Sequence, residues 1–239
     1  MKLTDFKALS FDCYGTLIDW ESGLLTALAP LLEQTGGAVS AEEALTAFGE
    51  LESEIEAASP TMLYPRILAA VHAALAERWG VEAGDEDHRC FGASVPYWPA
   101  FPDSAAALED LSRHYKLIIL SNVDRESFAG SNRRLAVTFD AVYTAEEIGS
   151  YKPSPANFEF LIERLQSDFG LQKHELLHTA QSLFHDHAPA KHFGLATAWI
   201  DRRADAEGWG ATPPPANSPT PDFRFHTLAE LAAAQRAEL

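Results

Sequence analysis

The sequence predicts an α/β fold in which a parallel sheet is flanked by helices and carries an all-helical insertion. Residues 104–200 alternate short apolar runs with runs of helical spacing, which is typical of parallel strands joined by right-handed crossovers. Residues 20–90 have helical spacing throughout and no strand pattern. We therefore expect a Rossmann-like core formed by residues 1–18 and 99–239, and a helical cap formed by residues 19–98.

The first strand is expected at residues 8–11, an apolar run that stops at a single carboxylate, Asp12, before a turn at Gly15. Open α/β sheets bind their ligands beyond the carboxyl ends of the strands. An aspartate in that place can act as a covalent nucleophile. The alternative is that Asp12 only caps a turn, where aspartate is common.

The cap is expected to consist of three or four helices, because its apolar residues recur three or four positions apart. Turn-forming residues break the pattern at positions 36–37, 59–60 and 80. The block ends in segment 94–103, where three prolines predict a stiff connector between cap and core.

The remaining elements follow from the same patterns. Strands are expected at residues 117–121, 139–143, 176–180, 195–200 and 223–227, and helices at residues 104–114, 124–135, 155–169, 189–193 and 228–239. The polar, proline-rich segment 204–221 predicts a surface loop.

The composition excludes some classes of binding partner. The 239 residues carry a formal net charge of −17, and this field repels nucleic acids and anionic membranes, so we expect neither as a partner. No apolar run reaches the roughly 18 residues of a membrane span. The first twenty residues lack the pattern of a signal peptide, which favours a cytoplasmic protein.

The segment 12–17, with the sequence DCYGTL, resembles the first motif of the haloacid dehalogenase superfamily. The first aspartate of that motif is the superfamily's nucleophile, which here is Asp12. Phosphatases of the superfamily have a second aspartate two residues later as a general acid, and this chain has Tyr14 there. That form is similar to the type II (S)-2-haloacid dehalogenases.

Three later segments resemble the other motifs in the superfamily's order. Ser121 and Asn122 follow an expected strand, Lys152 lies in a Ser-Tyr-Lys-Pro string, and Asp186 follows the strand expected at residues 176–180. Each has a plainer interpretation, since Ser-Asn pairs form turns and most lysines are exposed. The fourth segment departs from both subfamilies, because Gln181 and Leu183 stand where polar motif residues are usual.

The resemblance implies a two-step reaction on a small anionic organic substrate without a cofactor. Asp12 attacks the α-carbon of a short 2-haloalkanoate and expels halide, and water then hydrolyses the ester. Lys152 keeps Asp12 ionised, Thr16 supports it by a hydrogen bond, and Asp186, with Lys152 nearby, orients the water.

The same resemblance assigns the binding residues. Ser121 and backbone N–H groups near Tyr14 hold the substrate carboxylate, and Asn122 binds the departing halide. The cap arginine with which dehalogenases attract halide is missing from the acidic segment 47–54. Arg66 is the nearest substitute, although an exposed surface arginine is its plainer interpretation.

Two other functions stay open. One is a Mg²⁺-dependent phosphatase acting on a small phosphate ester, with Asp12, the Tyr14 backbone and Asp186 as ligands. Loss of the acid at Tyr14 favours carbon–halogen cleavage, because a halide leaves without a proton. The other is a binding protein without catalysis. The sequence leaves open the natural substrate and the choice between monomer and homodimer.

Overall fold

The computed structural model describes residues 1–239 and contains one sheet of six parallel strands. The strand order is β3-β2-β1-β4-β5-β6, so the order reverses at β1. The strands are β1 (Ala8–Phe11), β2 (Lys116–Ser121), β3 (Ala141–Thr144), β4 (Leu176–Ala180), β5 (Ala196–Ile200) and β6 (Phe223–Phe225). Ligands bind at such a reversal, so the residues that follow β1 and β4 occupy the expected position.

Helices cover both faces of the sheet, which explains why its central strands are apolar without alternation. Side chains alternate across the sheet, so Leu9 and Phe11 belong to one apolar cluster and Ala8 to the other. The first cluster includes residues of α5 (Ser104–Leu111), α6 (Arg125–Leu135) and α10 (Leu228–Ala237). The second includes residues of α8 (Pro155–Phe169) and α9 (Ala188–His192).

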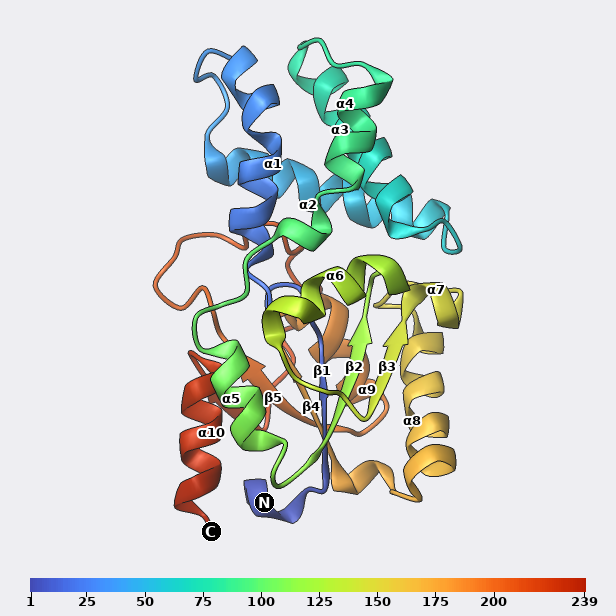
Figure 1. The fold of residues 1–239 in the computed structure, drawn as a ribbon, viewed down its shortest axis with the longest axis vertical. Coiled ribbons are helices and arrows are strands. Elements are labelled where there is room, and N and C mark those ends of the chain that lie inside the picture. The colour runs from blue at the N-terminus through green and yellow to red at the C-terminus, as the bar shows by residue number, and fades with distance from the viewer.

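The cap lies above the carboxyl ends of the strands, toward which the arrows of β2 and β3 point in Figure 1. It comprises α1 (Trp20–Gln34), α2 (Ala41–Ala58), α3 (Tyr64–Trp79), α4 (Asp85–Gly92) and the short 3₁₀ helix η2 (Val95–Tyr97). The start of α2 is set by Ser40, whose hydroxyl accepts a hydrogen bond from the Glu43 N–H, while the Glu43 carboxylate accepts one from the Ser40 N–H.

The predicted fold class is confirmed, and each predicted strand is found within about two residues. Five short elements were not predicted: the 3₁₀ helices η1 (Leu3–Asp5), η2 and η3 (Lys173–Glu175), the helix α7 (Ala145–Ile148), and a π-helical turn, η4 (Leu183–His187). The exact boundaries of cap and core at residues 18 and 98 stay a prediction.

The β5–β6 loop (residues 201–222) has no helix or strand, as expected, but it is not purely a surface loop. Ala211 and Thr212 are buried, and the Ala211 N–H donates to Glu21 of α1 at 3.0 Å. Arg203 forms ion pairs with both Glu21 and Glu42, the latter on α2. The loop therefore connects the core to the base of the cap. The polar composition of segment 204–221 did not predict this contact.

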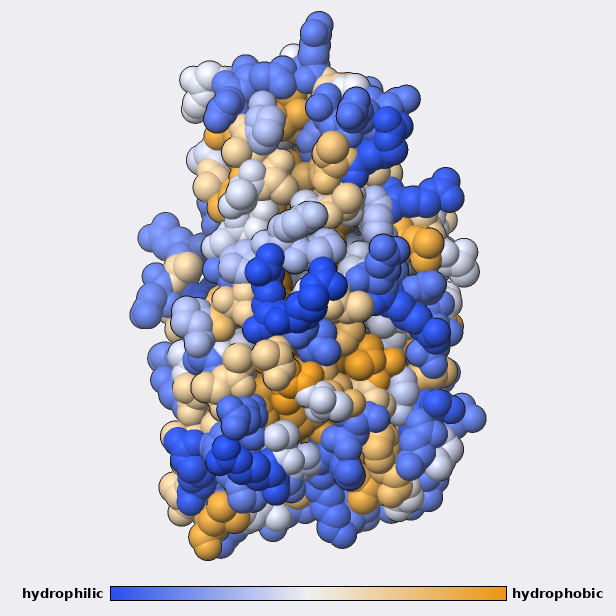
Figure 2. Space-filling view, in the orientation of Figure 1, coloured by the Kyte–Doolittle hydropathy of each residue, from blue (hydrophilic) through white to orange (hydrophobic).

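The outer surface is mostly hydrophilic. On the face in Figure 2, hydrophilic residues cover much of the cap, and apolar residues form separate patches over the core. None of the helices is both long and apolar enough to cross a membrane.

Candidate active site

Five of the predicted site residues line a cavity of about 40 Å³ between the sheet and the cap: Asp12, Tyr14, Asn122, Lys152 and Asp186. Asp12 follows β1, Asn122 follows β2, and Asp186 follows β4, so the topology alone brings these three together. Lys152 reaches the cavity from the segment that precedes α8.

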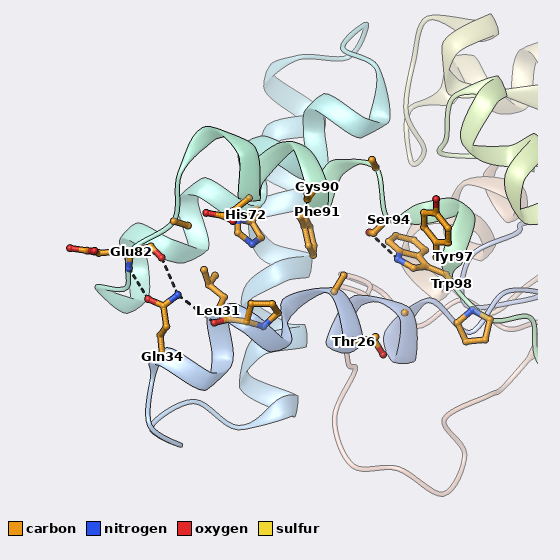
Figure 3. Close-up of a pocket in the computed structure, with 17 residues that line it drawn as sticks. Thr26, Leu31, Gln34, His72, Glu82, Cys90, Phe91, Ser94, Tyr97 and Trp98 are labelled. Atoms are coloured by element: carbon orange, nitrogen blue, oxygen red, sulfur yellow. Dashed lines mark hydrogen bonds between the residues drawn. The ribbon is translucent and has the colours of Figure 1, made fainter.

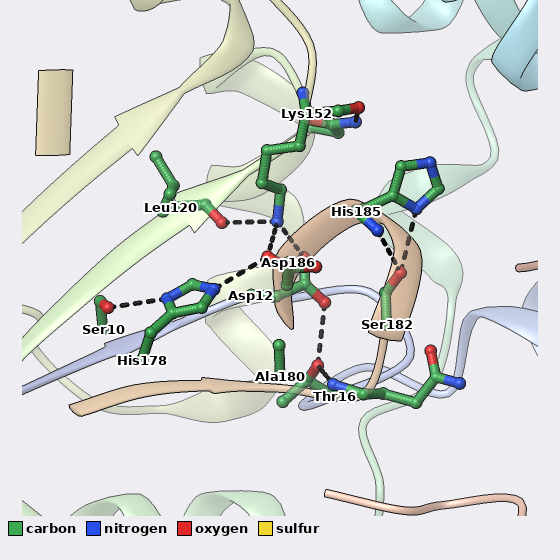
Figure 4. A network of polar contacts seen from close by, with 12 residues as sticks. Ser10, Asp12, Thr16, Leu120, Lys152, His178, Ala180, Ser182, His185 and Asp186 are labelled. Atoms are coloured by element: carbon green, nitrogen blue, oxygen red, sulfur yellow. Dashed lines mark hydrogen bonds and ion pairs between the residues drawn. The ribbon is translucent and has the colours of Figure 1, made fainter. Parts of the chain in front are cut away.

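Lys152 lies between the two aspartates (Figure 4). Its Nζ is 2.9 Å from Asp12 Oδ1, 2.6 Å from Asp186 Oδ1 and 3.1 Å from the Leu120 carbonyl oxygen. These three bonds use all three N–H groups of the ammonium. Burial lowers the pKa of Lys152, but the two carboxylates outweigh it and leave the pKa raised, so the side chain is a cation.

Asp12 is held on its other side by Thr16, whose hydroxyl donates to Oδ2 at 2.8 Å. The same hydroxyl oxygen accepts the backbone N–H of Gln181 at 2.9 Å, which fixes its orientation. Burial raises the pKa of Asp12, and the Lys152 ammonium opposes that rise. The hydrogen bond expected from Thr16 is therefore present, and both carboxylate oxygens have a donor.

Asp186 is oriented by a residue that the sequence analysis did not single out, His178 of β4. Its Nε2 lies 3.0 Å from Asp186 Oδ1, and its Nδ1 lies 2.8 Å from the Ser10 hydroxyl. Burial alone would raise the pKa of Asp186, but Lys152 and His178 lower it well below its usual range. A histidine inside an apolar strand was the available signal, because a fully buried imidazole requires polar partners.

Asn122 lines the cavity, but its amide is already engaged. Its Nδ2 donates to the Lys152 carbonyl oxygen at 3.0 Å and to Glu56 Oε2 at 3.2 Å, and its Oδ1 accepts the Lys152 N–H at 2.7 Å. The expectation that Asn122 binds a departing halide is therefore not supported, since no N–H remains free. Asn122 positions the backbone of Lys152 instead.

Tyr14 and Ser121 are both buried, and of the two only Tyr14 lines the cavity. The Tyr14 hydroxyl points away from the carboxylate to Ser131 of α6, 3.0 Å distant, and its ring packs edge-on against Trp98. The Ser121 hydroxyl has no hydrogen-bond partner, although it is fully buried.

Arg66 does not reach the site. Its side chain is exposed on α3 and does not line the cavity, so the expectation that it replaces the missing cap cation is wrong. On α3 it follows Tyr64, and it is Tyr64 that faces inward, with its hydroxyl donating to Glu52 at 2.6 Å.

Two cap carboxyl groups occupy the place where a cation was expected. Glu52 and Glu56 lie one turn apart on α2, are 4% and 5% exposed, and line the same cavity as Asp12. Burial raises the pKa of Glu52 to about 8 and that of Glu56 well above its usual range. Glu52 and Glu56 follow Leu45 and Phe48 at helical spacing, so they lie on the buried stripe of α2. A search for apolar residues alone assigns Leu51 and Ile55 to that stripe, but both are only partly buried.

The histidines that flank Asp186 differ in their surroundings. His185 lines the cavity, and its Nδ1 lies 3.2 Å from the Ser182 hydroxyl while its Nε2 has no partner. His187 bonds the Ala180 carbonyl oxygen at 2.9 Å, as expected of a structural residue. Burial lowers the pKa of each to about 4, so both are neutral at pH 7.

A second, larger cavity of about 580 Å³ lies within the cap (Figure 3). Leu31 of α1, His72 of α3 and Phe91 of α4 contribute to its walls, and none of the aspartates or lysines of the active site reaches it. The reactive groups therefore lie apart from this cap cavity, although Lys152, His185 and Glu56 also line another cavity, of about 390 Å³.

Comparison with known proteins agrees with this arrangement. The family model of the haloacid dehalogenase-like hydrolases matches residues 6–179. The chain therefore belongs to this family of hydrolases. No curated protein matches the chain by sequence.

Several solved structures share the fold over nearly the whole chain. The L-2-haloacid dehalogenase from Xanthobacter autotrophicus is 21% identical over 98% of this chain and 100% of that chain, with a TM-score of 0.78. The defluorinating L-2-haloacid dehalogenase Rha0230 is 20% identical over 98% of both chains, with a TM-score of 0.76. YfnB from Bacillus subtilis, whose structure holds magnesium, is 18% identical over 97% and 99%, with a TM-score of 0.74. At these identities the likeness establishes the fold alone.

Proposed function

We propose that this hydrolase is a 2-haloacid dehalogenase that converts a short 2-haloalkanoate to the 2-hydroxyacid through an ester on Asp12. The observation that carries the proposal is the surroundings of Asp12. Its carboxylate is held by the Lys152 ammonium and the Thr16 hydroxyl, and the neighbouring side chain, Tyr14, is turned away toward Ser131. The nucleophile thus has charge support and no acid on its own loop.

The first step is a displacement at carbon. An oxygen of Asp12 attacks the α-carbon from the side of the sheet, and the halide leaves with the bonding electrons on the opposite side, toward the cap. Ser121, whose buried hydroxyl has no partner, and backbone N–H groups near Tyr14 hold the substrate carboxylate. Fixing the carbon against Asp12 in a cavity of about 40 Å³ supplies the orientation that the displacement needs.

The second step is hydrolysis of the ester. Water attacks the carboxyl carbon of Asp12, releases the 2-hydroxyacid and restores the carboxylate. Asp186 orients this water through Oδ2, the buried oxygen that lacks a partner, while its Oδ1 stays bound to Lys152 and His178. The assignment is supported by the fold that this chain shares with known L-2-haloacid dehalogenases.

The residues around Asp12 fit a divalent metal poorly, so we infer that no Mg²⁺ takes part. Magnesium needs several oxygen ligands in a nearly octahedral arrangement. Here Asp12 and Asp186 share the Lys152 ammonium at 2.9 and 2.6 Å, which places a cation of the protein between the two carboxylates. Neither Tyr14 nor Gln181 offers the additional carboxylate that a metal site would use.

The test is halide release from chloroacetate, bromoacetate and 2-chloropropionate in EDTA, beside phosphate release from p-nitrophenyl phosphate with and without Mg²⁺. We expect halide release in EDTA that Asp12→Asn abolishes. Asp19→Asn, at the N-cap of α1 and outside the active-site cavity, serves as the control that keeps activity. Magnesium-dependent phosphate release without halide release would instead establish the phosphatase. Inactivity in both assays, despite a folded protein, would favour the binding protein.

A further inference from the structure

Lys152 is the only cation that lines the small cavity, and it belongs to the core. Any hydrogen-bond donor that the cap presents to the site is therefore a neutral group. Its three N–H groups are taken by Asp12, Leu120 and Asp186. Both N–H groups of Asn122 are taken as well. A halide expelled toward the cap therefore meets no free N–H group of Lys152 or Asn122.

Glu56 has a free oxygen in this place. Its Oε2 accepts a hydrogen bond from Asn122 at 3.2 Å, whereas its Oε1 is buried and has no partner. A carboxyl group that accepts at one oxygen carries its proton on the other. In the neutral form of Glu56, an O–H group at Oε1 is therefore left without an acceptor until a ligand enters.

The charge around Glu56 favours this neutral form. The titratable groups that face it are Glu52 on its own helix, Tyr64 on α3, Tyr151 and Lys152 before α8, and His185 on η4. Of these, only Lys152 is a cation, and Asp12 and Asp186 already engage it. Burial and the neighbouring Glu52 raise the pKa of Glu56, and Lys152 reverses only part of that rise.

We propose that Glu56, as a neutral acid on the cap, donates a hydrogen bond from its Oε1–H group to the leaving halide and thereby lets this site expel poor leaving groups. The proposal rests on the proposed dehalogenation. Asp12 attacks from the end of β1, so an in-line displacement sends the halide toward α2, which carries Glu56. His185 of η4 also has a free ring nitrogen and lines the same two cavities as Glu56, so the experiment below includes it.

The step balances without another reactant. As the Asp12 oxygen bonds to carbon, the carbon–halogen bond breaks, and the halide takes the electron pair and a hydrogen bond from Glu56. Fluoride, the most basic halide, accepts the strongest hydrogen bond of the series, and the proton stays on Glu56 throughout. Ester hydrolysis later releases one proton to solvent as the Asp12 carboxylate is restored, so each turnover yields the 2-hydroxyacid, a halide and a proton.

The experiment compares kcat/KM for fluoro-, chloro-, bromo- and iodoacetate in the full-length wild type, Glu56→Leu and Glu56→Gln. Leucine removes the hydrogen-bond donor, whereas glutamine keeps a weaker N–H donor in its place. Glu54→Gln, exposed on the same helix, is the matched control. We expect Glu56→Leu to lose about 100-fold on the halide of highest basicity that the wild type turns over, and less than about 10-fold on iodoacetate.

The glutamine variant and pH give two further readouts. Glu56→Gln should fall between the wild type and the leucine variant. In the wild type, the preference for good leaving groups should grow as pH rises and Glu56 ionises, and it should be independent of pH in Glu56→Leu.

Three results would overturn the proposal. Equal losses of Glu56→Leu on all four substrates would make Glu56 a structural residue while leaving the dehalogenase intact. A change in halide preference in His185→Gln but not in Glu56→Leu would assign the donor to His185. Absence of halide release from the wild type would end both the proposed function and this extension of it.

Discussion

At the scale of single residues, the site is organised around one buried ammonium. Lys152 is 2% exposed and compensates two carboxylates that are also buried, Asp12 and Asp186. An ion pair of this kind is costly to break, because removing one partner leaves charge in a medium of low polarity. Lys152 therefore contributes to stability as well as to the ionisation of the nucleophile.

The variant Lys152→Met tests both roles. It keeps the length of the side chain but leaves Asp12 and Asp186 without a cation. We expect the free energy of unfolding at pH 7 to fall by about 3–5 kcal/mol and activity to fall at least about 100-fold. Lys116→Met is the control, because Lys116 is exposed and pairs only with Asp140. Chemical denaturation that gives equal stability for both variants would contradict the role of Lys152.

The cap carboxyls make a separate prediction about pH. The pKa of Glu52 is about 8 in the folded chain and near 4.5 when the side chain is exposed. The folded state therefore holds the proton more tightly, and its advantage, complete below pH 4.5, is lost as pH rises toward 8. In this window the free energy of unfolding should fall by as much as about 1.4 kcal/mol per pH unit for this group.

Denaturation curves from pH 5 to 8 check that prediction. Glu52→Gln cannot ionise, so its stability should decline less with pH than that of the wild type. Glu54→Gln should follow the wild type, since Glu54 is exposed on the same helix. The prediction is contradicted if the free energy of unfolding falls with pH as steeply in Glu52→Gln as in the wild type, because Glu52 would then be ionised in the folded protein.

At the scale of elements, the β5–β6 loop and α2 form the contact that sets the cap over the sheet. Gly49 of α2 lies directly against the backbone of Ala211, and a Cβ at Gly49 would clash with the Ala211 carbonyl oxygen. The next residue of the loop, Thr212, lines the active-site cavity. Close approach at Gly49 thus fixes both the loop and the helix that carries Glu52 and Glu56.

Gly49→Ala tests this contact. We expect a loss of about 1–3 kcal/mol in stability, because backbone atoms must move apart to accept the methyl group, and a lower kcat/KM on haloacids. Gly84→Ala is the control, since a Cβ at Gly84 meets nothing closer than 3.7 Å. Unchanged melting temperature and activity in Gly49→Ala would show that the loop does not hold the cap in place.

Prediction from the sequence succeeded for elements whose pattern is local. Strand ends and the helical spacing of α1 to α4 could be read from neighbouring residues, and the strand-end rule placed Asp12 and Asp186 together. Helical spacing and an apolar strand pattern indicated that Glu52, Glu56 and His178 are buried. Their place in the site could not be predicted, because it depends on which distant groups complete the cavity. The prediction for Arg66 was wrong for the same reason, because packing against α2 determines which side of α3 faces the site.

At the scale of the whole molecule, the chain combines a common fold with an acidic active site. The net charge of −17 and the carboxyl groups of the cap disfavour an anionic substrate unless some of these groups are protonated. Neutral Glu52 and Glu56 reduce that cost, so in the proposed mechanism the core supplies the charged nucleophile, Asp12, and the cap supplies neutral acids. The apolar cluster that runs from β1 through Trp98 to α3 joins the two parts.

The central claim is that water attacks the carboxyl carbon of Asp12 after that residue has bonded to the substrate. A single turnover of haloacid by excess enzyme in H₂¹⁸O, followed by mass spectrometry of the peptide that contains Asp12, measures this directly. The account predicts ¹⁸O in the Asp12 peptide and an unlabelled 2-hydroxyacid. Label in the product hydroxyl, with an unlabelled Asp12 peptide, would show that water itself attacks the substrate and would contradict the account.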